Sequence, residues 1–311
     1  MKRILLVLPL FGLILAADPL AVEKIGPPLL LIESETYFMD PLWSPDGSQI
    51  ALTGSNYSGI YLYNFTGNEI TAISTNSSAG FGMSWSHAGD YIAARISKFE
   101  NKRRSSAVAI YAVRDGSETL LSDYETRLPG TPRWVTGDQT LYLTGSNHYR
   151  NFQVPLRSYT APRMGESVVY VKRNKIFSRN LLAERETRIE SVDGEIVTLT
   201  VAPDGSKLAY KIYGGDLWIS DIDGNNPVNL GSGHEPSWNP TSAKITFMVN
   251  SDDGHTITSS DIYVVNADGT GRINLTDTAD ILEMHPDWSP DGKWIAYDTY
   301  ENGQIWMQEV R

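Results

Sequence analysis

The stretch that decides the fold is Trp288-Ser289-Pro290-Asp291-Gly292-Lys293-Trp294-Ile295-Ala296-Tyr297. Pro290 presets the backbone for a tight turn, and Gly292 tolerates the conformation that closes it. From Trp294 onward the side chains alternate with a period of two residues, which is typical of a half-buried strand. The stretch therefore predicts the end of one strand, a turn and the start of the next strand.

The same phrase occurs six times along the chain, and the other five copies begin at Trp43, Trp85, Trp134, Val201 and Trp238. Each copy is followed by an apolar strand such as Ile50-Ala51-Leu52. When Ala202 is taken as the stand-in for the missing tryptophan, one interval, from Trp134 to Ala202, is longer than the others. Recurrence at intervals of roughly 20–50 residues indicates a repeat architecture.

A second phrase lies inside each interval, for example Asp261-Ile262-Tyr263-Val264-Val265-Asn266-Ala267-Asp268-Gly269. It is an alternating strand that ends in an Asp-Gly turn, and a short return strand such as Ile273-Asn274-Leu275 follows it. Each interval thus holds four antiparallel strands, which make one blade of an all-β propeller.

The number of blades and the closure of the ring follow from the ends of the repeats. Six start phrases favour a six-bladed β-propeller of four-stranded antiparallel blades. Residues 165–190 also align with a blade, so seven blades are the alternative, with 158–190 as a blade of its own. The last blade is one strand short, and residues 29–33 form an apolar strand that belongs to no complete blade. We expect this N-terminal strand to complete the last blade and close the ring.

Together, the Trp-Ser-Pro-Asp-Gly phrase and the Ile-Tyr-Val-Val-Asn-Ala-Asp-Gly phrase resemble the TolB-type propeller repeat, a WD40-like (PD40) repeat. The resemblance covers about residues 29–311 and concerns the propeller domain only, because nothing in this sequence corresponds to the N-terminal α/β domain of TolB. It implies a rigid propeller that presents loops to a partner in the cell envelope. The same repeat type is similar to that of oligogalacturonate lyases, which hold a metal in the propeller mouth, but no lyase residue pattern matches here.

Composition excludes several classes of function. The formal net charge is −11, which argues against a nucleic-acid partner, since phosphates need a basic surface. The chain has no cysteine, so a disulfide framework, a thiolate metal site and a cysteine nucleophile are excluded. No Gly-x-Ser-x-Gly nucleophile motif and no His-Glu-x-x-His motif is present.

The first residues predict a signal peptide over 1–17. Lys2 and Arg3 supply the positive start, residues 4–15 the apolar stretch, and Ala16-Ala17 the small residues near a cleavage point. A membrane anchor is the alternative, but the apolar stretch is shorter than the roughly 20 residues that a spanning helix needs. We expect a linker over 18–28, a single propeller domain over 29–311, no membrane span after signal removal, and a periplasmic or secreted protein.

The loops that enter the innermost strands should converge at the mouth of the central channel, which is the usual ligand site of a propeller. The candidate ligand- or partner-binding residues there are Asp40, Phe81, Arg127, His234, Glu235, Glu283 and His285. His234 and His285 are also candidate ligands of a divalent metal, because imidazoles and carboxylates on adjacent loops can hold one or act as acid and base. No cofactor is otherwise expected. The simpler interpretation is that these histidines bind neighbouring loops.

Three functions remain open on this evidence. The preferred one is a non-enzymatic scaffold that binds an envelope protein or peptide, for which Phe81 and other apolar residues near the mouth would serve as anchors. Binding of a glycan or small ligand is the second, and a metal-dependent polysaccharide lyase of the oligogalacturonate type is the third. Whether the protein is an enzyme stays undecided, with binding favoured.

Overall fold

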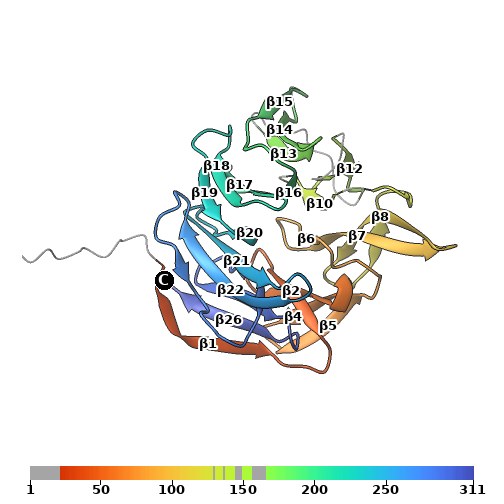
Figure 1. Ribbon diagram of the computed structural model, residues 1–311. Helices are drawn as coiled ribbons and strands as arrows, with labels where there is room; N and C mark the ends of the chain where they lie inside the picture. Colours follow the sequence, from red (N-terminus) through yellow and green to blue (C-terminus); the bar gives the residue numbers. More distant parts are fainter. Residues whose placement is uncertain (1–21, 129, 136, 144–148, 156–165) are drawn as a thin grey trace, which may run out of the picture.

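The computed structural model describes residues 22–128, 130–135, 137–143, 149–155 and 166–311. Their strands form seven antiparallel sheets that follow one another around a central axis, which makes the protein a β-propeller (Figure 1). The described residues contain no helix that is long and apolar enough to cross a membrane. The predicted signal peptide 1–17 lies outside the described residues.

The blades are numbered along the chain. Blade 1 contains β2 (Phe38–Trp43), β3 (Gln49–Gly54), the short 3-10 helix η1 (Ser55–Tyr57), β4 (Ser58–Asn64) and β5 (Glu69–Ser74). Blade 2 contains β6 (Ser84–Trp85), β7 (Tyr91–Glu100), β8 (Arg103–Ala112) and β9 (Glu118–Leu120). Blade 3 contains β10 (Pro132–Trp134), β11 (Thr140–Leu143) and β12 (Asn151–Gln153). Blade 4 contains β13 (Ser167–Lys172), β14 (Lys175–Asn180) and β15 (Glu186–Ile189).

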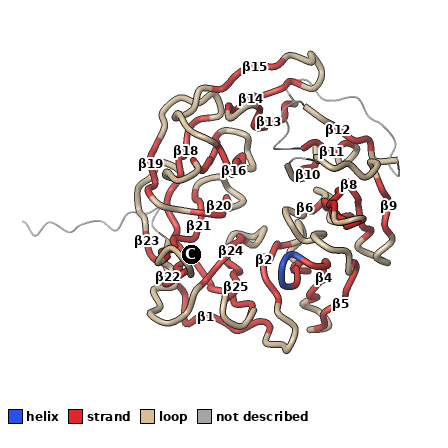
Figure 2. The backbone as a smooth tube through the Cα atoms, turned by 45° about the vertical axis from the view of Figure 1, so that its right-hand side comes forward, coloured by secondary structure: helices blue, strands red, loops and turns tan. Residues whose placement is uncertain are grey.

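The remaining blades have four strands each. Blade 5 contains β16 (Ile196–Val201), β17 (Lys207–Ile212), β18 (Leu217–Asp221) and β19 (Val228–Gly231). Blade 6 contains β20 (His234–Trp238), β21 (Lys244–Asp252), β22 (Ile257–Asn266) and β23 (Ile273–Asn274). Blade 7 contains β24 (Glu283–Trp288), β25 (Trp294–Thr299), β26 (Ile305–Val310) and β1 (Lys24–Ile32). The strands β2, β6, β10, β16, β20 and β24 lie nearest the axis (Figure 2).

The ring has seven blades, so the preference for six was wrong and the seven-blade alternative is confirmed. The long interval after Trp134 holds two sheets, because β13, β14 and β15 form a sheet of their own. Their hairpin closes through Arg173 and Asn174, both with positive φ, as a two-residue turn requires. This blade has no Trp phrase, which is the signal that the count of six depended on.

The predicted closure of the ring is confirmed, because β1 pairs with β26 at the outer edge of blade 7. The strand begins at Lys24, within the residues expected to form a linker. Pro27 and Pro28 lie where the register shifts, and an outermost strand tolerates them because its free edge needs no N–H donor. The buried amide of Gln308 donates from Nε2 to the carbonyl oxygens of Ile25 and Gly26, which satisfies the backbone at this irregularity.

The repeated phrase locks each innermost strand to its turn. In blade 7 the hydroxyl of Ser289 donates to Asp291 at 2.6 Å and accepts the backbone N–H of Trp294 at 2.9 Å. Asp291 also accepts the N–H of Lys293, so this aspartate bonds the turn from within. In blade 5 the register places Val201 opposite Leu208, as Trp288 lies opposite Ile295, so Val201 and not Ala202 takes the tryptophan position.

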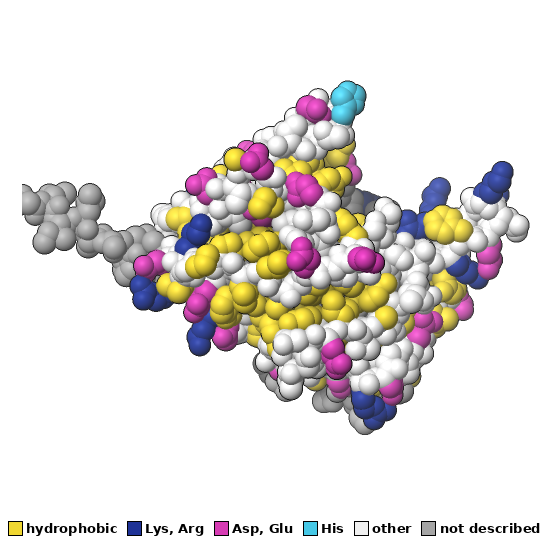
Figure 3. Space-filling model, turned by 90° about the horizontal axis from the view of Figure 1, so that it is seen from below, with side chains coloured by type: hydrophobic (Ala, Val, Ile, Leu, Met, Phe, Trp, Pro, Cys, Tyr) yellow, Lys and Arg dark blue, Asp and Glu magenta, His cyan; other side chains and the backbone are white. Residues whose placement is uncertain are grey.

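Two hairpins extend beyond the other strands of their blades. The strands β7 and β8 pair along their whole length up to the turn at Asn101 and Lys102, and Phe99 near the tip is 66% exposed. Lys and Arg side chains gather at one projecting tip of the surface (Figure 3). The second hairpin, β21–β22, carries the acidic residues Asp252 and Asp253. Residues 98–104, which are mostly charged, and residues 251–256, which carry two acidic side chains, therefore form the ends of regular hairpins.

Candidate functional site

Three innermost strands share an irregularity at the point where they enter the channel. Asp40, Glu235 and His285 each have positive φ, at 56°, 46° and 46°, and each is followed by a proline. In all three strands the register shifts at this position. A non-glycine residue in this conformation costs of order 1–3 kcal/mol, and such strain gathers at functional sites. The motif X-Pro-x-Trp thus marks equivalent channel positions in blades 1, 6 and 7.

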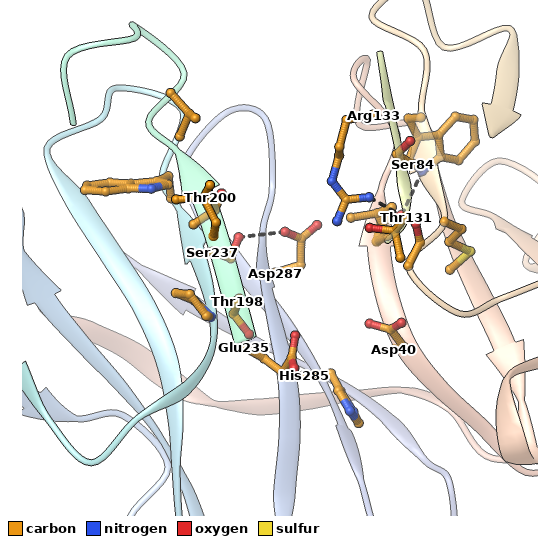
Figure 4. A pocket seen from close by; sticks show the side chains of 18 of the residues that line it. Asp40, Ser84, Thr131, Arg133, Thr198, Thr200, Glu235, Ser237, His285 and Asp287 are labelled. Carbon is orange, nitrogen blue, oxygen red and sulfur yellow. Dashed lines mark hydrogen bonds between the residues drawn. The ribbon is translucent and has the colours of Figure 1, made fainter. Parts of the chain in front are cut away.

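A cavity of about 800 Å³ lies on the axis among the innermost strands. Its polar side chains form two levels, and both are labelled in Figure 4. The mouth ring is defined here as Asp40, Thr131, Thr198, Glu235 and His285. The deep ring is defined as Ser84, Arg133, Thr200, Ser237 and Asp287. Four of these residues lie two positions after a member of the mouth ring, and Ser84 occupies the equivalent position of blade 2. Two residues of a strand span about 7 Å, which is the approximate separation of the rings.

The imidazole of His285 is held by a carboxylate behind the channel wall. Its Nδ1 lies 2.8 Å from Oδ1 of Asp298, which is 1% exposed. The same oxygen accepts the backbone N–H of Asp40 at 3.0 Å, so Asp298 on blade 7 also fixes the strained residue of blade 1. Burial opposes charge on His285, but Asp298, with Asp40 and Glu235, outweighs it and raises the pKa of His285 to about 10. His285 is therefore a cation at neutral pH.

Two carboxylates of the mouth ring remain available to a ligand. Asp40 and Glu235 both line the cavity, and among the described residues no hydrogen bond to their carboxylate oxygens is found. Burial raises the pKa of Asp40 to about 7, an increase that His285 opposes and Glu235 supports. A cationic group placed beside Asp40 would favour its charged form.

In the deep ring, the carboxylate of Asp287 forms hydrogen bonds that connect neighbouring blades. Its Oδ2 accepts the backbone N–H of Trp43 at 2.9 Å, and its Oδ1 accepts the hydroxyl of Ser237 at 2.7 Å. These bonds join blades 6, 7 and 1. Burial raises the pKa of Asp287 to about 6, and the two hydrogen bonds work against that rise. Both oxygens are thus already used by the protein.

Arg133 is the cation of the deep ring. One terminal nitrogen donates to the carbonyl oxygens of Gly82 and Pro132, at 3.0 and 3.1 Å, which fastens the guanidinium to the wall of the channel. No carboxylate of the described residues forms an ion pair with it. Figure 4 shows the guanidinium pointing into the channel from the wall opposite Asp287. The rest of its planar donor fork therefore faces the cavity.

Aromatic and cationic side chains line the rim beside blade 2. The rings of Tyr57 and Phe81 meet edge to face at 5.2 Å, and the guanidinium of Arg95 lies 4.9 Å from the centroid of Phe81. Arg95 also donates to the carbonyls of Leu128 and Gly130. Phe81 is 38% exposed and lines the cavity, so it is placed to contact a bound molecule.

The structure brings together four of the seven candidate residues, Asp40, Phe81, Glu235 and His285, which all line the cavity. His234, Arg127 and Glu283 do not line it. Arg127 lies exposed on its loop. Burial lowers the pKa of His234, and nearby Lys211 lowers it further. Glu283 is 2% exposed and lines a separate pocket of about 80 Å³, where burial raises its pKa to about 7.

The metal prediction for His234 and His285 stays a prediction. Within the described ranges no three His, Cys, Asp or Glu side chains form a group that could hold a metal ion. His285 would have to give up its proton to coordinate a metal, and its ion pair with Asp298 opposes that loss.

Sequence reasoning missed Arg133, Asp287 and Asp298. The first two have a sequence signal, because they occupy the position before the tryptophan in Thr131-Pro132-Arg133-Trp134 and His285-Pro286-Asp287-Trp288. In a strand this position points to the same side as the residue two before it. Asp298 has no such signal, since it reaches the site from the second strand of its blade.

No family model matches the chain, and no curated protein matches its sequence. Solved structures with the same fold include a protein described as TolB from Agrobacterium tumefaciens, with 18% identity and a TM-score of 0.56, over 90% of this chain and 92% of that one. TolB from Acinetobacter baumannii aligns with 15% identity and a TM-score of 0.57, over 83% of this chain and 59% of that one. An oligogalacturonate lyase in complex with manganese aligns with 13% identity, a TM-score of 0.50 and coverage of 90% and 79%. The chain thus has a TolB-like propeller fold, and identities at this level show the fold alone.

Proposed function

We propose that this protein is an exported binding scaffold of the cell envelope that receives a positively charged segment of a partner protein in its channel mouth. The observation that carries the proposal is the pair of carboxylates, Asp40 and Glu235, which line the cavity and form no hydrogen bond or ion pair with the described residues, although both lie within the electrostatic reach of His285. The neighbouring carboxylates, Asp287 and Asp298, are occupied by hydrogen bonds from the protein. Charge complementarity at such a mouth favours a cationic partner.

The protonated state of His285 favours binding over catalysis. A general base works best with a pKa near the operating pH, whereas Asp298 holds the pKa of His285 at about 10. The imidazolium then acts as a fixed donor through its second ring nitrogen. Exposed Phe81 at the rim adds an apolar anchor of the kind that dominates the energy of protein interfaces.

The acidic mouth ring also disfavours a polyuronate substrate, because a polyanion would meet Asp40 and Glu235 on entry. The likeness to an oligogalacturonate lyase therefore supports the fold without supporting that substrate for this chain.

The proposal is tested by placing a photo-crosslinking amino acid at Phe81 in cells that export the full chain. We expect an adduct with a discrete envelope protein, and the purified partner should bind the wild-type chain at least tenfold more tightly than the Asp40→Asn/Glu235→Gln variant. The control variant Glu35→Gln/Asp280→Asn removes the same charge from exposed positions outside the cavity and should bind as the wild type does. Equal loss in both variants would show a general charge effect and contradict the proposal, as would the absence of any adduct.

A further inference from the structure

The deep ring holds a guanidinium, that of Arg133, which forms no ion pair with a carboxylate of the described residues. Arg133 extends into the cavity and has its only described hydrogen bonds to two backbone carbonyls. Charged groups removed from bulk water are normally paired, because desolvation of a lone charge is costly. The guanidinium fork matches the oxygens of a carboxylate or a phosphate in a bidentate arrangement.

The acidic residue across the channel is not the missing partner. Figure 4 shows Asp287 on the wall facing Arg133, but among the described residues no hydrogen bond or ion pair joins the two, and the oxygens of Asp287 are oriented by hydrogen bonds from Trp43 and Ser237. Rotation of Asp287 toward Arg133 would break the contacts that join blades 6, 7 and 1. The position beside Arg133 is therefore left for an anion that enters from outside.

Charge is divided along the axis of the channel. The mouth ring presents the carboxylates of Asp40 and Glu235 beside the imidazolium of His285, whose charge Asp298 balances from behind the wall. The deep ring, about 7 Å further in, presents Arg133, while its carboxylate, Asp287, is hydrogen-bonded to Trp43 and Ser237. A ligand that satisfies both levels has an anionic end that goes in first and a cationic group that stays near the mouth. A free anion or a polyanion could pair only with Arg133 of the deep ring, and the carboxylates of the mouth ring would repel it.

We propose that the channel captures the carboxyl terminus of a partner polypeptide, with the terminal carboxylate bound by Arg133 and a lysine or arginine side chain near the end bound between Asp40 and Glu235. This inference rests on the proposed function and narrows it to one part of the partner. In an extended peptide, the third residue from the end lies about 7 Å from the last, which matches the spacing of the rings. Neutral donors in the deep ring, such as the hydroxyl of Thr200, line the same level.

The test uses two N-acetylated hexapeptide pools with lysine fixed at the third position from the end and the other positions randomised. One pool ends in a free carboxylate and the other in a carboxamide. Peptides retained on the immobilised full chain are counted by mass spectrometry. We expect the carboxylate pool to be retained at least tenfold better than the carboxamide pool on the wild type, and nearly equally on Arg133→Gln. Arg133→Lys, which keeps the charge and loses the fork, should fall between them.

The mouth ring gives an independent arm of the test. Replacing the fixed lysine by norleucine should weaken retention on the wild type and have little effect on Asp40→Asn/Glu235→Gln, which should still prefer the carboxylate. Because the comparison of the two pools on the wild type needs no variant, poor folding of a variant cannot mask the result.

Three outcomes would overturn the inference. In the first, both pools bind equally to the wild type, while the Asp40→Asn/Glu235→Gln variant still loses the crosslinked partner. The proposed function then stands, and the binding of a terminal carboxylate by Arg133 is contradicted. If neither pool is retained on the wild type, the channel does not read a peptide end. Retention of a galacturonate oligomer that depends on Arg133 would assign the anion to a uronic acid instead.

Discussion

The variant Asp298→Asn should lower the free energy of unfolding by about 3–5 kcal/mol, because removal of one partner leaves the buried imidazolium of His285 without its counter-ion. Asp298 is 1% exposed, and its Oδ1 serves both His285 and the backbone N–H of Asp40. Asparagine keeps the size and an acceptor oxygen but not the charge. Chemical denaturation of the two proteins at pH 7 measures the difference.

The pH dependence separates loss of charge from loss of packing. The folded state raises the pKa of His285 from 6.5 to about 10, so its contribution to stability is complete below pH 6.5 and is lost as the pH rises through 10. The wild type should therefore lose stability between pH 7 and 10, by an amount on the order of 3 kcal/mol. Asp298→Asn should show a flatter profile over that range. Parallel profiles in the two proteins would show that the ion pair contributes nothing.

The variant Ile32→Asp should destabilise the protein by more than about 4 kcal/mol, because it places an unpaired carboxylate in the core where the ring closes. Ile32 is 5% exposed and packs in one cluster with Phe38, Ile50, Ile305 and Met307. The loss would detach β1 from β26 and expose the edge of blade 7. Thermal unfolding and the exchange rates of the amides in β26 both report on it.

The same strand provides the control. Leu29 lies on β1 and is 50% exposed, so Leu29→Asp adds the same charge to the closing strand without burying it. We expect a change within about 1 kcal/mol for this variant. Equal destabilisation by the two substitutions would mean that charge on the strand, and not loss of the buried side chain, weakens the closure.

The sequence was informative where a structural signal repeats. The phrase around Trp288 predicted the strands and turns of most blades, and the apolar stretch 29–33 predicted the closing strand. The blade count failed because blade 4 has no copy of the phrase, and its first hairpin closes instead through the two-residue turn at Arg173 and Asn174. Its strands β13 and β14 form six residue pairs, as any single β-hairpin can, so nothing in this segment marks it as a copy of the repeat.

Within the site, the sequence predicted the residues that the repeat brings to the mouth, and Asp40, Glu235 and His285 do line one cavity. It could not predict the hydrogen bonds that cross from blade to blade. His87, which takes the place of a turn proline, shows the reason. Its backbone N–H and ring nitrogen both contact Asp138 of the next blade, whereas a proline has no N–H to donate. Such a pair cannot be predicted from the sequence, because it depends on how the turns of two neighbouring blades are placed in space.

The pairing of the first and last described segments of the propeller determines how the ring would respond to force. The backbones of Glu23 and Arg311 bond to each other in both directions, and Lys24 pairs with Val310 in the first rung of the ladder between β1 and β26. Tension applied through the two ends would load these rungs one at a time, in the manner of a zipper, instead of shearing them all together. The closure of the ring would thus yield at a lower force than a sheared pair of strands, and a tether at one end alone would leave it unloaded.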